Sequence, residues 1–481
     1  MSFAHYDRLT ALDATFLDIE DPGVHMHVGA VAVFEGEPLR TAEGAIDIER
    51  IRAYTASALH EAPRFRQKVA RVPFVGQPVW VDDPRFNLSY HVRHTALPPP
   101  GSIRQLKRLA GRIFSQKLDR GKPLWEMWVV EGLEDGRFGL IVKAHHCMAD
   151  GLAGLDLLAV ILRLEPDTAI ENGDRQWVPR PRPAGGRLLT DEVWRRATWP
   201  LSAMREVPSA LLHPRQSAAA LADSVRALAE TFSAGLVPTT DTPLNVEIGP
   251  YRRYDWVSFP IAEVRAVREA LGGSLNDVVL ATVAGAVGRF LRRRGETINA
   301  ASVFRVMVPV SIRAGDERGS AGNRVVNFLA ALPIEETDPA RRVERIMETM
   351  RRLKRSRLVH GAELIEDISD HSFTTLLVQF VKLAAQTRAY NMVVTNVPGP
   401  PVPIYLLGAR MEEIYPLVPL FSGQGLGVAL FSYDGTLSWG FNADWDALPD
   451  LHDFVEGVEL EFSRLRKAAD AARTTAKHSP A

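Results

Sequence analysis

The chain has 481 residues, of which 46% are apolar and 24% are charged, an ordinary globular composition that is long enough for two domains. The formal net charge of -1 provides no global field that would draw the protein to nucleic acid. The single cysteine, Cys147, excludes an internal disulfide. From the composition and the net charge together, we expect an enzyme-like globular protein without a nucleic-acid partner.

The N-terminal 30 residues carry several acidic side chains and lack the continuous apolar core of a signal peptide. Farther along, the most apolar stretch, 373–385, contains Gln379 and Lys382 and is shorter than the roughly 20 apolar residues of a spanning helix. We therefore expect a cytoplasmic protein whose membrane contact is peripheral.

Residues 1–165 show the alternation of strands and helices that is typical of an α/β domain. Helical spacing of apolar residues occurs near 50–60 and 104–117. The expected strands are 28–34, 79–81, 127–130 and 139–144. The first predicted domain therefore covers residues 1–165.

Residues 166–240 are predicted to be a linker. Prolines and glycines between 179 and 186 oppose regular structure, and the stretch 188–235 has helical spacing that Pro200, Pro208 and Pro214 interrupt. A linker of this kind can bridge two domains.

Residues 241–467 are predicted to form a second α/β domain. Helices are expected at 261–271 and 276–293, and a β-branched run follows at 303–310. Asp434–Gly435 separates two strand-like runs and predicts a tight hairpin turn. Residues 468–481 are small and polar, and we expect them to form a flexible tail.

The most informative motif is His-His-x-x-x-Asp-Gly, at the junction between a predicted strand and a predicted helix. On a strand, alternate side chains face opposite ways, so His146 would share the face of Ala144, whereas His145 would share that of Lys143. If Lys143 marks the solvent side, His146 lies on the drier side, where burial keeps the imidazole neutral. A neutral imidazole is the starting form of a general base, with His145 as its support.

The acidic residue of this motif has two interpretations. Asp150 can cap the helix predicted at 152–164, with Gly151 easing the turn. Alternatively, its carboxylate pairs with an arginine from elsewhere and holds the loop that carries His146. Cys147 is interpreted as a small buried apolar group rather than as a nucleophile.

We expect no metal, because neighbouring histidines on a strand point apart, unlike the paired histidines of a helical zinc site. The chain also lacks a Cys-x-x-Cys pair, a Gly-x-x-x-x-Gly-Lys-Ser/Thr phosphate loop and a Gly-x-Ser-x-Gly elbow. A base that acts directly on a substrate proton is the chemistry that remains.

Further short blocks accompany the histidine motif along nearly the whole chain. In order they are Leu12–Leu17, His27–Gly29, Pro123–Glu126, the histidine motif, Asn276–Asp277, Val308–Arg313, Gly322–Asn323 and Thr395–Pro400. With these blocks the chain resembles the bacterial wax ester synthase/acyl-CoA:diacylglycerol acyltransferase family.

The resemblance implies two chloramphenicol acetyltransferase-like domains, each a mixed sheet with flanking helices, and an active-site tunnel between them. It also implies that His146 is the general base and that Arg313 is the partner of Asp150. The activity implied is transfer of a long-chain acyl group from acyl-CoA to diacylglycerol, or to a long-chain fatty alcohol as in wax ester synthesis. No cofactor is implied, since acyl-CoA is a substrate.

Two more distant classes remain as alternatives at this stage: amide-bond formation by a condensation-type domain, and a non-catalytic lipid-binding protein. The other blocks have two interpretations each. Pro123, Leu124 and Trp125 either belong to the core or line the acyl channel, and Asn276 and Asp277 either cap a helix or lie near the site.

Residues 341–357 form a basic amphipathic pattern. Its simplest interpretation is a solvated helix over a core. The alternative is docking to anionic lipid or to the phosphates of CoA.

Overall fold

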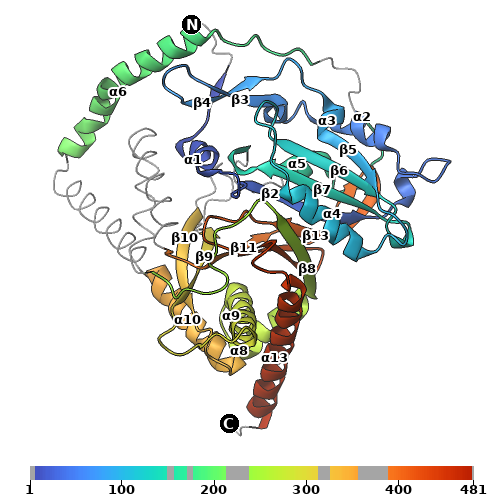
Figure 1. Cartoon of the computed structure of the whole chain (residues 1–481), viewed down its shortest axis with the longest axis vertical. Helices are drawn as coiled ribbons and strands as arrows, with labels where there is room; N and C mark the ends of the chain where they lie inside the picture. Colours follow the sequence, from blue (N-terminus) through green and yellow to red (C-terminus); the bar gives the residue numbers. More distant parts are fainter. Residues whose placement is uncertain are drawn as a thin grey trace.

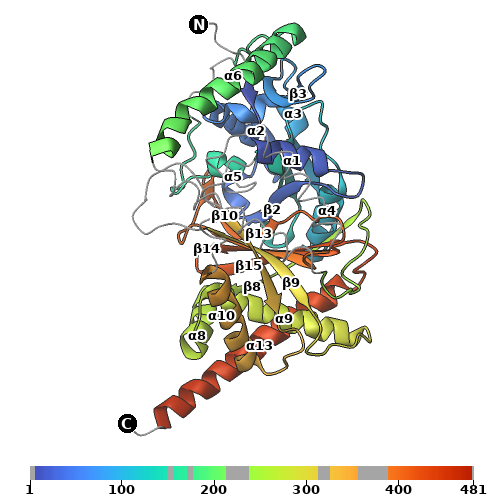
Figure 2. The same cartoon turned by 90° about the vertical axis from the view of Figure 1, so that its left-hand side faces the viewer.

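The computed structural model describes residues 6–148, 156–170, 177–212, 238–311, 325–355 and 388–478. Within these ranges the chain forms two six-stranded sheets and one three-stranded sheet, with helices packed around them (Figures 1 and 2). The predicted α/β class, with mixed sheets in a two-domain architecture, is confirmed.

The first six-stranded sheet has the order β12-β13-β2-β7-β6-β5. Its strands are β2 (His27–Phe34), β5 (Val92–Ala96), β6 (Trp125–Glu131), β7 (Phe138–His145), β12 (Tyr405–Leu406) and β13 (Ala409–Leu417). Only β5 and β6 pair in parallel among these strands, and every residue of β7 is buried. Such a strand lies in the middle of the domain, covered on both faces.

Helices and short strands surround this sheet. They are α1 (Ala11–Ile19), α2 (Ile48–Ala58), α3 (Leu88–His91), α4 (Ile103–Ser115) and α5 (Asp156–Ile161), with β1 (Asp7–Arg8), β3 (Gln67–Arg71) and β4 (Pro78–Asp82) in the small sheet. One face of the large sheet packs on α2 and α5, and the other packs on α4 and on β8 of the second sheet. A capping box between Ser102 and Gln105 starts α4, which buries Leu106, Ala110 and Ile113 against the sheet.

The second six-stranded sheet has the order β10-β9-β11-β14-β15-β8. Its strands are β8 (Arg252–Pro260), β9 (Phe304–Ser311), β10 (Val325–Leu332), β11 (Met392–Pro398), β14 (Leu426–Tyr433) and β15 (Thr436–Asp444). The predicted hairpin is confirmed, because Tyr433 pairs with Thr436 across Asp434 and Gly435, both of which have positive φ.

Four helices cover one face of this second sheet in the lower part of Figure 1. They are α8 (Ile261–Leu271), α9 (Leu275–Arg293), α10 (Pro339–Arg355) and α13 (Leu451–His478). Their apolar side chains form the main core of the domain with the sheet. The side of α10 that faces this core carries Val343, Ile346 and Met350, as expected for an amphipathic helix over a core.

Three findings differ from the predicted boundaries. First, β12 and β13 come from residues 405–417 yet belong to the first sheet, so the domains are not two consecutive stretches of chain. Second, α13 continues to His478, so the stretch predicted to be a tail from 468 is helical up to that residue. Third, α6 (Gly185–Leu212) runs without interruption past Pro200 and Pro208.

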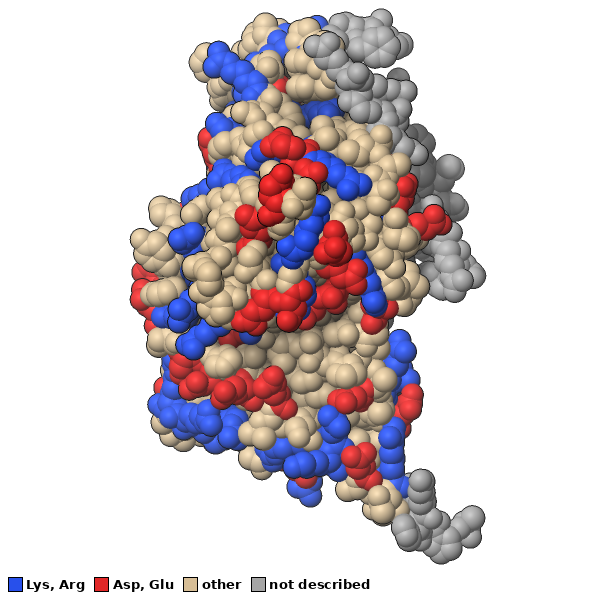
Figure 3. Space-filling view, turned by 90° about the vertical axis from the view of Figure 1, so that its right-hand side faces the viewer, with Lys and Arg blue, Asp and Glu red and all other residues tan. Residues whose placement is uncertain are grey.

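Among the described residues, no single helix is long and apolar enough to cross a membrane. The pair α8 and α9, which is bent by 94°, passes that test together by length and composition alone. On the face shown in Figure 3, basic and acidic side chains are interspersed, in keeping with the small net charge.

The two sheets meet where β13 passes β15. A Cβ atom on Gly440 would lie 1.9 Å from the carbonyl oxygen of Pro416, so only glycine fits this crossing. Beside it, the Tyr254 hydroxyl lies within hydrogen-bond distance of the carbonyl oxygens of Tyr415 (2.9 Å) and Pro416 (2.8 Å). Backbone contact of this kind holds the two domains at a single spacing.

We expect Gly440→Ala to lower the free energy of unfolding by about 1–3 kcal/mol, because the added methyl group overlaps a backbone carbonyl that has no room to move. Urea denaturation measures the change. Gly186→Ala is the matched control, because a Cβ at that helical position meets nothing within 4 Å and should leave stability the same or slightly higher. Equal midpoints for the two variants would contradict the role of Gly440.

Candidate active site

The histidine motif begins at the end of β7. The strand ends at His145, and a short 3-10 turn, η4 (His146–Met148), starts at His146. The backbone N–H of His145 donates to the carbonyl of Leu124 at 2.9 Å, and that of His146 donates to the carbonyl of Met26 at 2.8 Å. Two segments that are distant in sequence therefore hold the pair of histidines between them.

His146 is enclosed by the N-terminal helix. Its ring stacks on Phe16 of α1, with 3.9 Å between the ring centroids, and burial lowers its pKa to about 4. Within the described part of the chain, its Nδ1 atom has no hydrogen-bond partner. The imidazole is therefore neutral at physiological pH, which is the form a general base needs before it takes a proton.

The sequence argument for this neutrality was wrong in one step. Lys143 does not mark solvent: its side chain is fully buried, and Nζ donates to the carbonyls of Ile113 (2.9 Å) and Gln116 (2.6 Å). Burial lowers the pKa of Lys143 to about 8, with the carboxylate of Glu126 3.8 Å away. Because both faces of β7 are covered and His146 lies past the end of the strand, strand alternation does not separate a dry face from a wet one.

His145 is also buried, and burial lowers its pKa to about 3. The backbone N–H of Cys147 donates to its Nδ1 atom at 3.2 Å, so the ring proton of the neutral form is on Nε2. Burial raises the pKa of the Cys147 thiol well above its usual value, in keeping with a buried apolar group rather than a thiolate nucleophile.

A buried carboxylate lies beside His145. Oε1 of Glu20 is 3.7 Å from Nε2 of His145 and 3.9 Å from Nε2 of His27, while Oε2 accepts from Nη2 of Arg120 at 2.7 Å. Burial lowers the pKa of His25 to about 4 and that of His27 well below its usual value. The site thus combines neutral histidines with one ion pair, Glu20–Arg120.

The sequence analysis gave no role to Glu20 or His25, and it included Phe16 and His27 only as parts of family blocks. The pairing of β2 with β7, which sets His27 opposite His145, is what brings these residues together. No spacing within the chain indicates this pairing, because β2 and β7 are distant in the sequence and pair only after folding.

Pro123, Leu124 and Trp125 are buried. The Trp125 indole donates to the carbonyl of Phe65 at 2.7 Å and stacks on His91 with 4.6 Å between ring centroids, which is the packing of a core residue. The block nevertheless touches the site through the Leu124 carbonyl that His145 uses.

Asn276 and Asp277 lie at the start of α9. Oδ2 of Asp277 accepts from the backbone N–H and the hydroxyl of Ser274, both at 2.7 Å, so its carboxylate caps the helix. Oδ1 of Asn276 accepts from Nδ2 of Asn396 at 2.7 Å, which joins two of the family blocks. Asp150, Gly151 and Arg313 lie outside the described residues, so the pairing of Asp150 with Arg313 stays a prediction.

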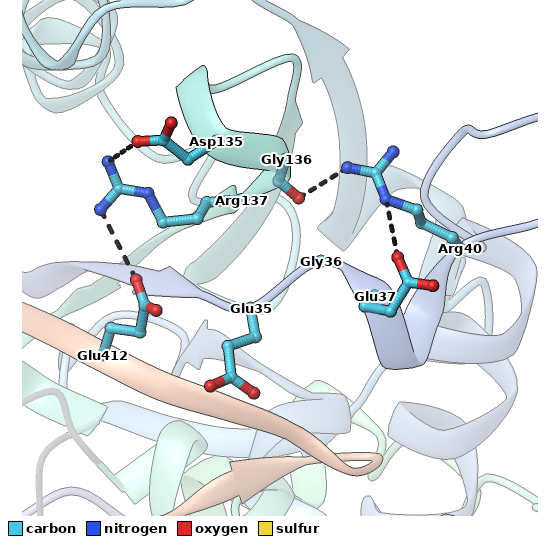
Figure 4. Close-up of a pocket in the computed structure, with 8 residues that line it drawn as sticks. All are labelled: Glu35, Gly36, Glu37, Arg40, Asp135, Gly136, Arg137 and Glu412. Atoms are coloured by element: carbon cyan, nitrogen blue, oxygen red, sulfur yellow. Dashed lines mark hydrogen bonds and ion pairs between the residues drawn. The ribbon is translucent and has the colours of Figure 1, made fainter.

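The pocket in Figure 4 is at the other end of the sheet, around the ends of β2 and β7 where Phe34 pairs with Phe138. Its arginines are paired: Arg40 lies 3.6 Å from Glu37 and donates to the Gly136 carbonyl at 2.7 Å, and Arg137 lies 3.5 Å from Glu412. Eight-residue strands place this pocket more than about 20 Å from the histidines. It is therefore not part of the candidate active site. The described residues contain no group of three or more histidine, cysteine or acidic side chains that could hold a metal ion.

The buried histidines predict a loss of stability in acid. His25, His27, His91 and His145 are buried and His146 is half-buried, and removal from water lowers the pKa of each. Above pH about 6.5 they are neutral in both the folded and the unfolded chain and contribute no pH dependence. Below pH about 6.5, these histidines become protonated in the unfolded chain but stay neutral in the folded chain until about pH 4. The free energy of unfolding therefore falls as the pH falls through this window.

Chemical denaturation at pH 8, 7, 6 and 5 measures this effect. Each such histidine contributes up to about 1.4 kcal/mol per pH unit. In the variant His146→Gln, the free energy of unfolding should change less steeply with pH, by the contribution of a single histidine. A free energy of unfolding that does not change between pH 7 and pH 5 would contradict the burial of these rings.

Comparison with known proteins gives matches along nearly the whole chain. A family model described as the wax ester synthase/diacylglycerol acyltransferase catalytic domain matches residues 9–279, and the model of the WS/DGAT C-terminal domain matches residues 321–466. A protein of Mycobacterium tuberculosis named "probable diacylglycerol O-acyltransferase tgs1" is 33% identical over 466 residues, covering 95% of this chain and 96% of its own. A second protein of that organism, named tgs2, is 32% identical, covering 96% of this chain and 99% of its own.

Solved structures show the same architecture. The wax ester synthase/diacylglycerol acyltransferase from Marinobacter aquaeolei VT8 is 27% identical, with a TM-score of 0.67 over 96% of this chain and 100% of its own. The starter condensation domain of rhizomide synthetase is 13% identical, with a TM-score of 0.57 over 97% of this chain and 94% of its own, and it shares the fold alone.

Proposed function

Because the chain belongs to the wax ester synthase/diacylglycerol acyltransferase family, we propose that it transfers a long-chain acyl group from acyl-CoA to the free hydroxyl of diacylglycerol. The products are triacylglycerol and CoA. The observation that carries the proposal is His146, a neutral, half-buried imidazole at a strand end whose buried Nδ1 atom makes no hydrogen bond within the described residues. The names of the mycobacterial relatives support diacylglycerol as the acceptor.

The reaction proceeds without a covalent enzyme intermediate. His146 takes the proton of the acceptor hydroxyl while that oxygen attacks the thioester carbonyl. The tetrahedral intermediate collapses, the carbon–sulfur bond breaks, and the imidazolium returns the proton to the departing thiolate. Atoms and charges balance without a cofactor. An imidazolium is a stronger acid than a thiol, so the second proton transfer is favourable.

His145 acts as support in this mechanism rather than as the base. Its Nδ1 atom is occupied by the Cys147 N–H, and its Nε2 atom faces Glu20. Asp150 is proposed to hold the loop after His146 by pairing with Arg313 across the two domains, with Gly151 easing the turn. An acyl-channel role for Pro123, Leu124 and Trp125 has less support, because the Trp125 ring packs in the core, where it contacts Phe65 and His91.

Wax ester synthesis is the second candidate. The family model and the Marinobacter relative carry both activities in their names, so a long-chain fatty alcohol is the alternative acceptor. A condensation-type reaction is disfavoured, because the resemblance to that class is limited to the fold. Acceptors of either kind reside in membranes or lipid droplets, and we propose peripheral contact with such a surface.

Thiol release from palmitoyl-CoA, measured with diacylglycerol or hexadecanol as acceptor, tests the proposal. We expect acceptor-dependent release from the wild type, faster with diacylglycerol, and a loss of about 10²- to 10⁴-fold in kcat for His146→Ala. His60→Ala is the control, because that ring is exposed on the surface and should leave the rate unchanged. Thermal melting establishes that each variant is folded.

Two outcomes would overturn the proposal. Equal activity of folded His146→Ala and wild type would remove the role of His146. If the folded wild type released thiol with neither acceptor, the condensation-type and lipid-binding functions would be favoured instead. Faster release with hexadecanol than with diacylglycerol would exchange the order of the two acceptors.

A further inference from the structure

We infer that a basic groove beside α4 binds the nucleotide end of acyl-CoA. The groove, called the α4 groove below, has a volume of about 1350 Å³ and lies between α4, residues 251–255 at the start of β8, and residues 445–452. The inference rests on the proposed function, because it assigns a binding place to that reaction's acyl donor. The two domains form opposite walls, so a ligand in the groove touches both.

A row of arginines forms the wall on α4. Arg104, Arg108 and Arg112 line the groove, are exposed and are spaced by four residues, which places them in one line along the helix. Like charges at this spacing destabilise a helix, and none of the three has an ion pair within the described residues. An anionic ligand that lies along the row removes this repulsion.

The rest of the groove does not neutralise that charge. Its lining has one acidic side chain, Asp255, against the five basic ones Arg104, Lys107, Arg108, Arg112 and Arg253, while the sixth, Arg252, is buried and donates to backbone carbonyls. Asp255 is already paired, with Nζ of Lys107 on one oxygen and Nδ1 of His452 at 2.9 Å from the other. The groove therefore carries a net positive charge that fits several phosphate groups.

Two exposed aromatic rings lie in the same groove. Trp445 is 46% exposed and Tyr251 is 61% exposed, which is unusual for rings of this size, and the guanidinium of Arg253 lies 3.8 Å from the centre of the Trp445 ring. Exposed rings beside arginines provide stacking surfaces for a purine base. A planar base joined to phosphates is the chemistry of a nucleotide, whereas a lipid headgroup has no such base, so we commit to the nucleotide of CoA.

The inner end of the groove adjoins the histidine site. One lining residue is Gln116, whose backbone carbonyl accepts a hydrogen bond from Nζ of Lys143. Lys143 is buried in β7, two residues before His145. Another lining residue, Arg252, donates to the carbonyl of Gly23, two residues before His25. On this inference, a ligand with its nucleotide in the groove directs its pantetheine arm toward the wall formed by Gln116 and Arg252, behind which these histidines lie.

The other basic helix, α10, is less suited to this role. Arg342 is buried against Glu461 at 2.7 Å, and Arg345 pairs with Glu335 at 2.7 Å. Its basic residues are thus partly neutralised within the domain. Of the two basic helices, only α4 combines unpaired arginines, within the described residues, with a groove and exposed aromatic rings.

The test is the double variant Arg108→Glu/Arg112→Glu. We expect its KM for palmitoyl-CoA to rise at least about tenfold, the equivalent of losing one charge-assisted contact, while kcat and the KM for diacylglycerol stay near those of the wild type. Calorimetric titration with adenosine 3′,5′-bisphosphate should detect binding to the wild type and none to the variant. Trp445→Ala should weaken binding of the same probe without a change of charge.

The control is Arg265→Glu/Arg293→Glu, two exposed arginines on α8 and α9 that do not line the groove. This variant has the same change of charge and should bind the bisphosphate as the wild type does. If the groove variant does not fold, Arg112→Gln replaces it, because a neutral side chain at an exposed position perturbs the helix least.

Unchanged bisphosphate binding and unchanged KM for palmitoyl-CoA in the groove variant would overturn the inference and leave the proposed function intact. Bisphosphate binding that depends on the groove, in a wild type without acyl transfer, would instead overturn the proposed function and leave a nucleotide site. Loss of binding to phosphatidylglycerol vesicles, with bisphosphate binding unchanged, would overturn the inference in favour of a lipid-docking surface.

Discussion

The pairing of β13 with β2 is the constraint on which the rest of the structure depends. β13 comes from the C-terminal part of the chain, yet it extends the sheet whose central strand ends at His145. The same β2 sets His27 opposite His145, and the residue before it, Met26, accepts the N–H of His146. The histidine turn is therefore held by a strand that the second half of the chain supports, and the Gly440 crossing keeps the two sheets in contact.

Burial determines the electrostatics of the site. Lys143 is buried between two carbonyls and Glu126, Glu20 pairs with Arg120, and the histidines between them stay neutral because a low-dielectric surrounding disfavours the imidazolium. The α4 groove differs from this arrangement, because Arg104, Arg108 and Arg112 are exposed and have no ion pair among the described residues. A dry reaction centre next to a basic, open groove suits a substrate with a long apolar chain at one end and phosphates at the other.

Sequence reasoning recovered the strand that carries the motif, the neutrality of His146 and the α/β class, because an apolar β-branched run and a rare motif are local signals. It reached the neutrality of His146 by a wrong step, since Lys143 lies in the core and not in solvent. A lysine on a strand normally indicates an exposed face. Here the carbonyls at the C-terminal end of α4 accept hydrogen bonds from Lys143 and so compensate for its burial. No local sequence pattern around Lys143 indicates these acceptors.

The sequence by itself determined the local features: the histidine motif at the end of a strand, the cap of α9 at Asp277, and the hairpin at Asp434–Gly435. These depend on neighbours within a few residues, where chain connectivity sets the geometry. The tertiary structure alone decided which distant groups surround them, namely Glu20 and Phe16 beside the histidines, β13 in the first sheet, and the walls of the α4 groove. The physical reason is that packing and strand pairing between distant segments follow from the whole core at once, and no window of the sequence contains both partners.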